Sequence, residues 1–248
     1  MSNDIKIRES NYDLLRVFSA IAVIVIHVSG YFTESLLNGS AVYMDSVCTL
    51  VLYNTLSRFA VPCFMMLSGA FLLADDRNAD YKYFYRKSFK GIGIQIIIFL
   101  FVFFAYSEIV ALHGVITNGN RFTELIKPVV SLFKGDLNYH LWYLYTLTGV
   151  YILLPMLVRY KNSIGEKTFG IVSWIYLVVA VFSGWTSTFK IEWGIAKVVC
   201  YLGFVFVGYW LRKNIVKKNN FHGVLLIITG LLSQLIMAFA QYRYILAG

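Results

Sequence analysis

Charged residues are scarce in this sequence. Asp, Glu, Lys and Arg make up only 14% of its 248 residues, against roughly 25% in a typical soluble domain, and this excludes an ordinary soluble fold. Cysteine is also rare: Cys48, Cys63 and Cys200 form no CxxC pair and no cluster with histidine. The sequence therefore supports neither a disulfide framework nor a zinc site, and we expect no bound metal.

Apolar residues are abundant and gather into long runs. They make up 58% of the chain, and each run has about 20 residues, the length that an α-helix needs to cross roughly 30 Å of hydrocarbon. The runs lie at about 12–32, 47–73, 91–112, 139–158, 169–187, 195–211 and 223–243. Since there is no internal repeat and no loop long enough to fold alone, the sequence predicts one all-α domain over residues 1–248, a polytopic transmembrane bundle of about seven spans.

Basic residues outnumber acidic ones, which gives a net charge of +9. Of the 22 basic residues, 14 lie in segments that seven spans would place on one side: before residue 12, and at 74–90, 159–168 and 212–222. Because Lys and Arg are enriched in cytoplasmic loops, the N-terminus is predicted to be cytoplasmic. In a membrane protein such an excess reflects orientation and anionic headgroups, so we expect membrane lipids and no nucleic acid as partners.

Two ionisable residues lie in the first apolar run, where charge is costly and marks a candidate functional site. Arg16 and His27 are eleven residues apart, so at about 100° per residue they share one helix face, about 16 Å apart along its axis. Arg16 can bind phosphate bidentately, and His27 can exchange a proton near neutral pH. A phosphorylated donor that is held at the inner membrane surface and reaches His27 fits this spacing. Alternatively, Arg16 only extends to the interface and His27 only hydrogen-bonds a neighbouring helix.

The second apolar run contains further polar residues. Arg58 lies near the membrane midplane, where it needs a partner or water and is expected to face the bundle interior. A structural ion pair with Glu108 or another acid is the alternative. Ser68 and Gly69 lie near the cytoplasmic end of the run, where small residues allow a ligand or, more commonly, another helix to approach closely.

Basic and aromatic residues alternate in the segment 81–90, between the second and third runs. Arg86, Lys87 and Lys90 belong to this segment, which is suited to bind lipid headgroups or the phosphates of a nucleotide-containing donor. On the opposite side of the membrane, His140 and Trp142 open the fourth run. Tryptophan there is typical of the aromatic belt, whereas His140 is a candidate acceptor-site residue.

Four sequence blocks follow one another in a fixed order over residues 11–158. They are NYDLLR ending at Arg16, with His27 after ten further residues; RFAVPCFMMLSGAFLL at 58–73; YRKSFK at 85–90; and HLWYL at 140–144. These blocks resemble the Arg-x10-His, VPxFFxxSGxLL, Arg-x-x-Arg and HLWFL motifs of the acyltransferase-3 family of integral-membrane acyltransferases. The resemblance is closest to its branch of surface-polysaccharide O-acetyltransferases.

This resemblance implies that acyl-CoA binds from the cytoplasm and that its acyl group passes to an acceptor hydroxyl on the other side. It implies that His27 is the catalytic base or acyl relay, and that basic residues hold the phosphates of the donor while Ser68 lines the acyl path. The residues expected to bind the donor are Arg16, Ser68, Arg86, Lys87 and Lys90, and those expected to bind the acceptor substrate are Arg58, His140 and Trp142.

The sequence departs from the family pattern in two respects. Lysine stands at 87 and 90, where the family has arginine, and this weakens a bidentate phosphate contact. Family members also have more spans than the seven predicted here, so we expect a member that is shortened at its C-terminus.

The resulting hypothesis is an enzyme of the bacterial plasma membrane, a membrane-bound O-acyltransferase. It would transfer an acyl group, expected to be acetyl, from acetyl-CoA to a hydroxyl of a cell-envelope glycan or lipid-linked saccharide, with no permanently bound cofactor. A homo-oligomer or a partner subunit is left open. The alternatives are a carrier or flippase without chemistry, and an accessory membrane module such as the membrane portion of racemases that resembles this family.

Overall fold

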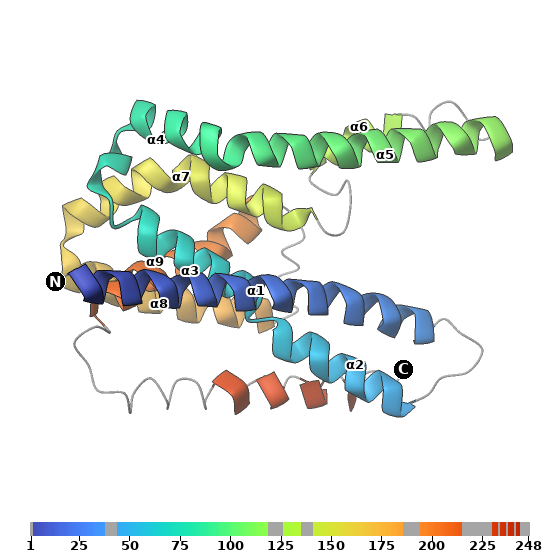
Figure 1. The fold of residues 1–248 in the computed structure, drawn as a ribbon, viewed down its shortest axis with the longest axis horizontal. Coiled ribbons are helices and arrows are strands. Elements are labelled where there is room, and N and C mark those ends of the chain that lie inside the picture. The colour runs from blue at the N-terminus through green and yellow to red at the C-terminus, as the bar shows by residue number, and fades with distance from the viewer. Residues whose placement is uncertain are drawn as a thin grey trace. The chain divides into compact units, whose positions relative to one another are not determined.

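The computed structural model of the chain describes residues 2–37, 44–118, 126–134, 141–185, 194–214 and short pieces between 230 and 243. Every regular element within these ranges is helical, which confirms the all-α prediction for them (Figure 1). The α-helices are α1 (Ser2–Leu37), α2 (Met44–Ser57), α3 (Ala60–Leu72), α4 (Tyr81–Ser88), α5 (Ile94–Asn118), α6 (Lys127–Lys134), α7 (Trp142–Ile164), α8 (Glu166–Trp185) and α9 (Gly194–Asn214). A 3-10 helix, η1 (Asp76–Ala79), precedes α4, and a π-helical segment, η2 (Phe89–Gly93), joins α4 to α5.

Within the described residues, three helical stretches are long and apolar enough to cross a membrane: Ser10–Thr33, Ser46–Leu72 and Tyr81–His113. Helices suit this environment because they satisfy their backbone hydrogen bonds internally. Helices α7, α8 and α9 coincide with three more of the predicted runs, whereas the run at 223–243 is described only in short pieces from residue 230 onward. The count of seven spans and the cytoplasmic N-terminus stay predictions.

The predicted run at 47–73 forms two helices rather than one. Helix α2 ends at Ser57, Arg58 and Phe59 form a turn, and α3 begins directly after it. Pro62 explains the break, because proline has no N–H and its ring crowds the carbonyl of the residue four positions earlier, here Arg58. In the first turn of α3, by contrast, a proline is well tolerated. The following helical stretch also differs from prediction, since it begins at Tyr81 rather than near 91.

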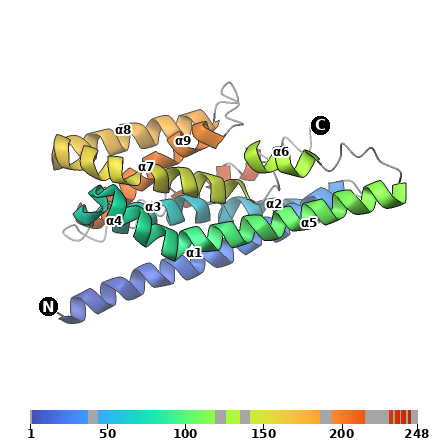
Figure 2. The same cartoon turned by 90° about the horizontal axis from the view of Figure 1, so that it is seen from above.

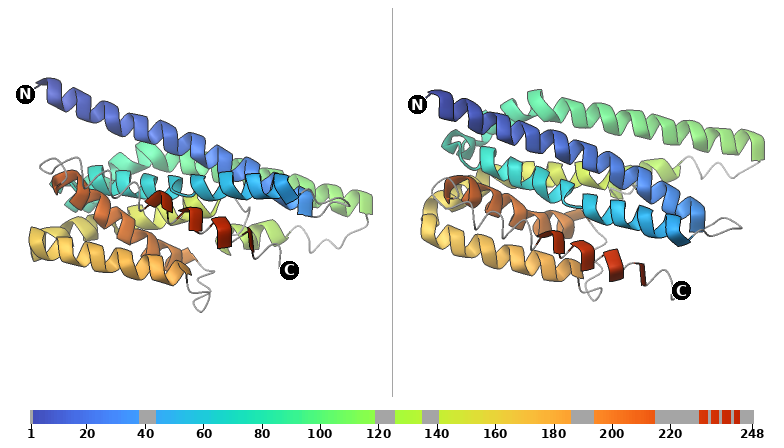
Figure 3. Two further views of the ribbon diagram at one scale, coloured as in Figure 1. Left: turned by 90° about the horizontal axis from the view of Figure 1, so that it is seen from below. Right: turned by 60° about the horizontal axis from the view of Figure 1, so that its bottom comes forward.

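The chain divides into two compact units, and the first comprises Met1–Leu67 and Leu211–Gly248. Within it, α1 runs as one uninterrupted helix (Figures 2 and 3) and packs against α2. Among the side chains of α1 that the structure describes, the buried ones are all small, namely Ser19, Ala22 and Ser29. Small side chains allow the backbones of membrane helices to approach closely, which accounts for this contact.

The second unit, Ser68–Trp210, contains α4 to α8 and most of α9. Its core includes Phe84 of α4, Leu154 of α7, Phe169 of α8 and Val205 of α9, each less than 2% exposed. Helices α8 and α9 lie side by side (Figure 2), with the rings of Phe169 and Phe206 5.3 Å apart. These contacts hold the helices of this unit around the connection that leads into α4.

Gly69 permits a close approach of α3 and α9 within the second unit. A Cβ atom at this position would lie only 1.8 Å from the carbonyl oxygen of Val205, so no residue with a side chain fits without displacing a helix backbone. The small residue near the end of the second run therefore serves helix packing, as the commoner of the two sequence interpretations predicts.

Candidate functional site

Helix α1 carries the predicted pair Arg16 and His27. Because the helix is continuous from Ser2 to Leu37, the pair keeps its common face and its axial separation of about 16 Å. Arg16 is exposed, and its guanidinium forms an ion pair with Asp13, one turn earlier. His27 is half-buried. The candidate span Ser10–Thr33 therefore holds a cation toward one end and an imidazole toward the other.

Asn54 of α2 binds the turn of α1 that contains His27. Its Nδ2 donates to the carbonyl oxygen of Ile26 at 3.0 Å and to the hydroxyl of Ser29 at 3.2 Å. The Ser29 hydroxyl donates in turn to the carbonyl of Val25 at 2.6 Å. Polar side chains that hydrogen-bond across helices stabilise helix pairs in membranes by about 1 kcal/mol each. The segment around His27 is thereby fixed against α2.

Arg58 lies at the break between α2 and α3, where it is exposed, contrary to the expectation that it faces the bundle interior, and it is joined to the same amide. Its Nε and Nη2 both donate to Oδ1 of Asn54, at 3.1 Å each. In the first unit, the side chain of Asn54 thus connects Arg58, which is predicted to bind substrate, to the turn of α1 that carries His27. Helix α3 begins two residues after Arg58, so its positive dipole end lies at the same break.

The basic residues predicted to hold the donor lie in the second unit, at the end of α4 and in η2. Asp80 caps α4, because its carboxylate accepts hydrogen bonds from the backbone N–H groups of Lys82 and Tyr83. Arg86 and Lys87 lie in the last turn, where cations complement the helix dipole. Both are exposed, as is Lys90 within the π-helical segment. These cations are open to an anionic ligand from the surrounding phase.

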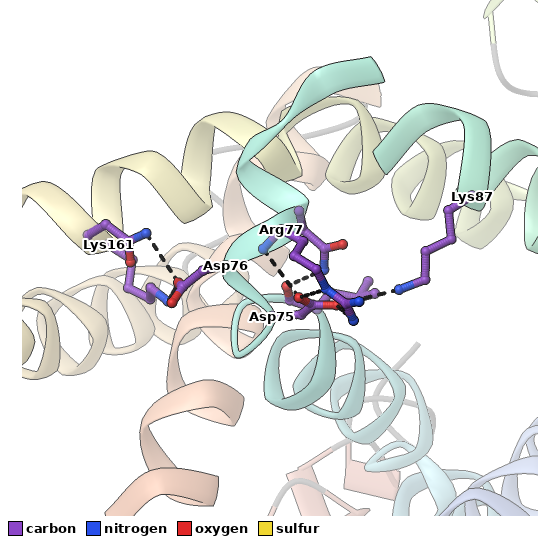
Figure 4. Close-up of polar contacts among 8 residues, drawn as sticks. Asp75, Asp76, Arg77, Lys87 and Lys161 are labelled. Atoms are coloured by element: carbon purple, nitrogen blue, oxygen red, sulfur yellow. Dashed lines mark hydrogen bonds and ion pairs between the residues drawn. The ribbon is translucent and has the colours of Figure 1, made fainter. Parts of the chain in front are cut away.

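Asp75 balances part of this charge. Its carboxylate accepts a bidentate pair of hydrogen bonds from Arg77, both at 2.9 Å, and lies 3.6 Å from Nζ of Lys87. The bonds from Arg77 are the main cause that lowers the pKa of Asp75 to about 2. Asp75 is therefore ionised at neutral pH and holds the Lys87 side chain over the connection between α3 and α4 (Figure 4).

A buried lysine ties the same connection to α7. Lys161 is 8% exposed, and its Nζ donates to the carbonyl oxygen of Leu73 and to Oδ1 of Asp76, both at 2.8 Å (Figure 4). It also lies 5.0 Å from the ring centroid of Tyr209. The hydrogen bond from Lys161 is the largest of the effects that lower the pKa of Asp76, followed by that from Asn162.

Ser68 and Trp142 both belong to the second unit and contact aromatic residues there. Ser68 hydrogen-bonds the side chain of Tyr151 on α7, whose ring lies 5.9 Å from that of Phe84 on α4. Trp142 lies against Tyr201, with ring centroids 5.7 Å apart. His140 lies outside the described residues. Among those that are described, no group of three or more His, Cys, Asp or Glu side chains is placed to hold a metal ion.

The structure groups the predicted residues in two sets, one in each unit. The first unit contains Arg16, His27 and Arg58, and the second contains Ser68, Arg86, Lys87, Lys90 and Trp142. Sequence reasoning missed Asn54 and Lys161. An asparagine within an apolar run was the available signal for Asn54, but its partners on α1 are more than 20 residues away. Lys161 gave no signal, since its sequence context is that of any other lysine in a loop predicted to be cytoplasmic.

Comparison with known proteins places these residues in a family. The sequence profile of the family described as "Acyltransferase domain" matches residues 9–246. A curated relative from Enterococcus faecalis, named as an amino-acid racemase, is 33% identical over 182 residues. That alignment covers 70% of this chain and only 22% of the racemase, so the similarity concerns a minor part of the relative. No solved structure matches the chain.

Proposed function

The chain belongs to the acyltransferase-3 family, and from that membership we propose that it transfers an acetyl group from acetyl-CoA to a hydroxyl of a cell-envelope glycan or lipid-linked saccharide. Acetyl-CoA would bind on the cytoplasmic side of a bacterial plasma membrane, and the acceptor would bind on the other side. The excess of Lys and Arg in alternate connections supports this orientation, with seven spans and a cytoplasmic N-terminus. CoA enters and leaves as a substrate, so the reaction needs no resident cofactor.

The observation that carries this proposal is the position of His27. An alcohol attacks a thioester slowly unless a base removes its proton, and histidine is the usual base near neutral pH. Of the two histidines in the described residues, His113 lies at the end of a candidate span, whereas His27 lies inside one. His27 is half-buried and next to residues that α2 holds in place. It is therefore suited to accept the proton of an acceptor hydroxyl.

Exposed cations of each unit are proposed to bind phosphates of the donor: Arg16 in the first unit, and Arg86, Lys87 and Lys90 in the second, each set considered by itself. Arg16 lies on the same face of α1 as His27, and an extended pantetheine arm covers the axial distance of about 16 Å between them. Arg16 and Lys87 each have a carboxylate neighbour, Asp13 and Asp75 respectively. These neighbours orient the cations before the phosphates of the donor bind.

Acetyl transfer tests the proposal directly. Membranes from cells that express the full chain are incubated with acetyl-CoA labelled in the acetyl group, and label in the glycan fraction is measured. We expect labelling by the wild type and a loss of at least about 100-fold in His27→Ala, the contribution typical of a general base. His113→Ala is the matched control and should label as the wild type does. Equal labelling by wild type and His27→Ala would remove His27 from the mechanism.

A second candidate function is an accessory or carrier module without acyl chemistry. The similarity to a protein named as an amino-acid racemase favours it, because a related segment occurs there in a protein whose name is not that of an acyltransferase. In that case the wild type would insert and fold but transfer no label. A carrier would still move saccharide across the membrane, whereas an anchoring module would not.

A further inference from the structure

The amide of Asn54 has only one orientation that its surroundings accept. The carbonyl of Ile26 can only accept a hydrogen bond, and the guanidinium of Arg58 can only donate. The nitrogen of the amide must therefore face α1, and its oxygen must face Arg58, as the structure has them. The hydroxyl of Ser29 donates to the carbonyl of Val25 and so offers its lone pairs to Asn54. The side chain of Asn54 thus links Arg58 to α1, and the amide can form both sets of hydrogen bonds in only this orientation.

This link attaches to α1 on both sides of His27. Ile26 precedes the histidine and Ser29 follows it by two residues, and Ser29 is only 3% exposed. Asn54 lies in the last turn of α2, and Arg58 follows directly after the end of that helix, so the guanidinium reaches back over one turn to the amide oxygen. The guanidinium of Arg58 is consequently held at a fixed position relative to the turn of α1 that carries His27, the proposed base.

During acyl transfer, the carbonyl oxygen of the thioester acquires a negative charge that the enzyme must stabilise. His27 takes the proton of the acceptor hydroxyl while the hydroxyl oxygen forms a bond to the thioester carbon, and the carbonyl oxygen becomes an oxyanion. When the carbonyl double bond re-forms, the carbon–sulfur bond breaks. The CoA sulfur leaves as a thiolate and takes the proton from His27. Donors that are oriented in advance toward such an oxyanion make large contributions to the rate.

We propose that Asn54 is a positioning residue, which holds Arg58 so that its guanidinium stabilises the oxyanion formed beside His27. This inference rests on the acetyl transfer proposed above and assigns a role to a residue that the family motifs do not include. A guanidinium suits the task because it keeps its charge at every physiological pH. The positive end of α3 at the same break favours negative charge there as well.

A double-mutant cycle tests whether Asn54 acts through Arg58. The full-length wild type, Asn54→Ala, Arg58→Ala and the double variant are compared for acetyl transfer, with kcat and the KM for acetyl-CoA measured separately. We expect Arg58→Ala to lower kcat by about 100-fold, as loss of one oxyanion donor does, and Asn54→Ala to lower it by about 10-fold or more. The double variant should be no slower than Arg58→Ala, and the KM for acetyl-CoA should change less than twofold. Thr49→Ala, an exposed polar residue of α2, is the matched control and should keep the wild-type rate.

Each outcome of the cycle decides the question. Losses that multiply in the double variant would mean that Asn54 acts independently of Arg58, and would overturn the proposal. If Asn54→Ala fails to fold, Asn54→Gln replaces it: glutamine keeps an amide N–H for α1, but its longer side chain moves the amide oxygen away from the guanidinium of Arg58, so kcat should fall as expected for Asn54→Ala. A fully active Asn54→Gln would overturn the proposal too. An inactive wild type would instead refute the acetyl transfer itself, and this inference with it.

Discussion

Replacing Lys161 with methionine should destabilise the second unit although the side chain has no place in the proposed chemistry. The ammonium group joins α7 to the end of α3 through the carbonyl of Leu73 and to η1 through Asp76. Methionine preserves most of the apolar stem and removes the three donors. The segment between α3 and α4 would then lose the hydrogen bonds by which Lys161 joins it to α7.

The expected cost follows from what each partner loses. The carbonyl of Leu73 loses a charged donor in a buried environment, which costs about 1 to 3 kcal/mol. Asp76 has 72% of its side chain exposed, so it returns to water at little cost and keeps its bond from Asn162. We therefore expect Lys161→Met to lower the free energy of unfolding by about 2 kcal/mol. Asp76→Asn should cost about 3 kcal/mol, because it leaves the buried ammonium without its counter-charge.

Thermal unfolding of the detergent-purified protein measures these changes. For a protein of this size, 2 kcal/mol corresponds to a fall in Tm of about 4 to 8 °C. Lys167→Met, at an exposed position of α8, is the matched control and should change the stability by less than about 0.5 kcal/mol. If Lys161→Met unfolds at the same temperature as this control, the bonds of Lys161 do not stabilise the unit and the reasoning is wrong.

Three further predictions concern pH, packing and donor binding. Because the pKa of Asp75 falls from its ordinary 3.8 to about 2 on folding, its contribution to stability is complete above pH 3.8 and lost as the pH falls toward 2; the Tm difference between wild type and Asp75→Asn should shrink over that range. Gly69→Ala should cost about 2 kcal/mol, because its Cβ would clash with the Val205 carbonyl. Gly91→Ala, where nothing lies within 4 Å, should be neutral or slightly stabilising; similar Tm values for the two variants would contradict the close approach. Arg16→Ala should raise the KM for acetyl-CoA by about tenfold, as loss of a charged phosphate contact of 1.5 to 3 kcal/mol predicts at its lower end, with kcat little changed; an unchanged KM would remove Arg16 from the donor site.

The sequence predicts those features that depend on local pattern. Apolar runs determine where helices form, and a continuous helix places Arg16 and His27 on one face. The break at Arg58 was also accessible, since Pro62 disfavours a helix through the residue four positions before it. The π-helical segment from Phe89 to Gly93 was not, because its two glycines are equally compatible with an ordinary helix or a loop.

Contacts between distant segments could not be predicted in this way. Asn54 interrupts an apolar run, and that pattern alone indicates a polar partner somewhere in the bundle. The partner turned out to be a backbone carbonyl and a serine on α1, 25 to 28 residues earlier. A backbone carbonyl occurs at every residue, so nothing in the sequence distinguishes the one beside His27 from the others. The packing of α1 on α2 selects it.

Lys161 shows the same limit for charge. Counted among the basic residues of one side, it contributes to the predicted orientation, and that use needs only its sign. Its burial could not be predicted from the sequence, because a lysine at the end of an apolar helix is normally hydrated. Here the chain returns from α3 through η1 and brings a carbonyl and a carboxylate to within 2.8 Å of its Nζ atom. Burial of this charge is therefore a property of the tertiary fold, and its removal reports on the fold rather than on orientation.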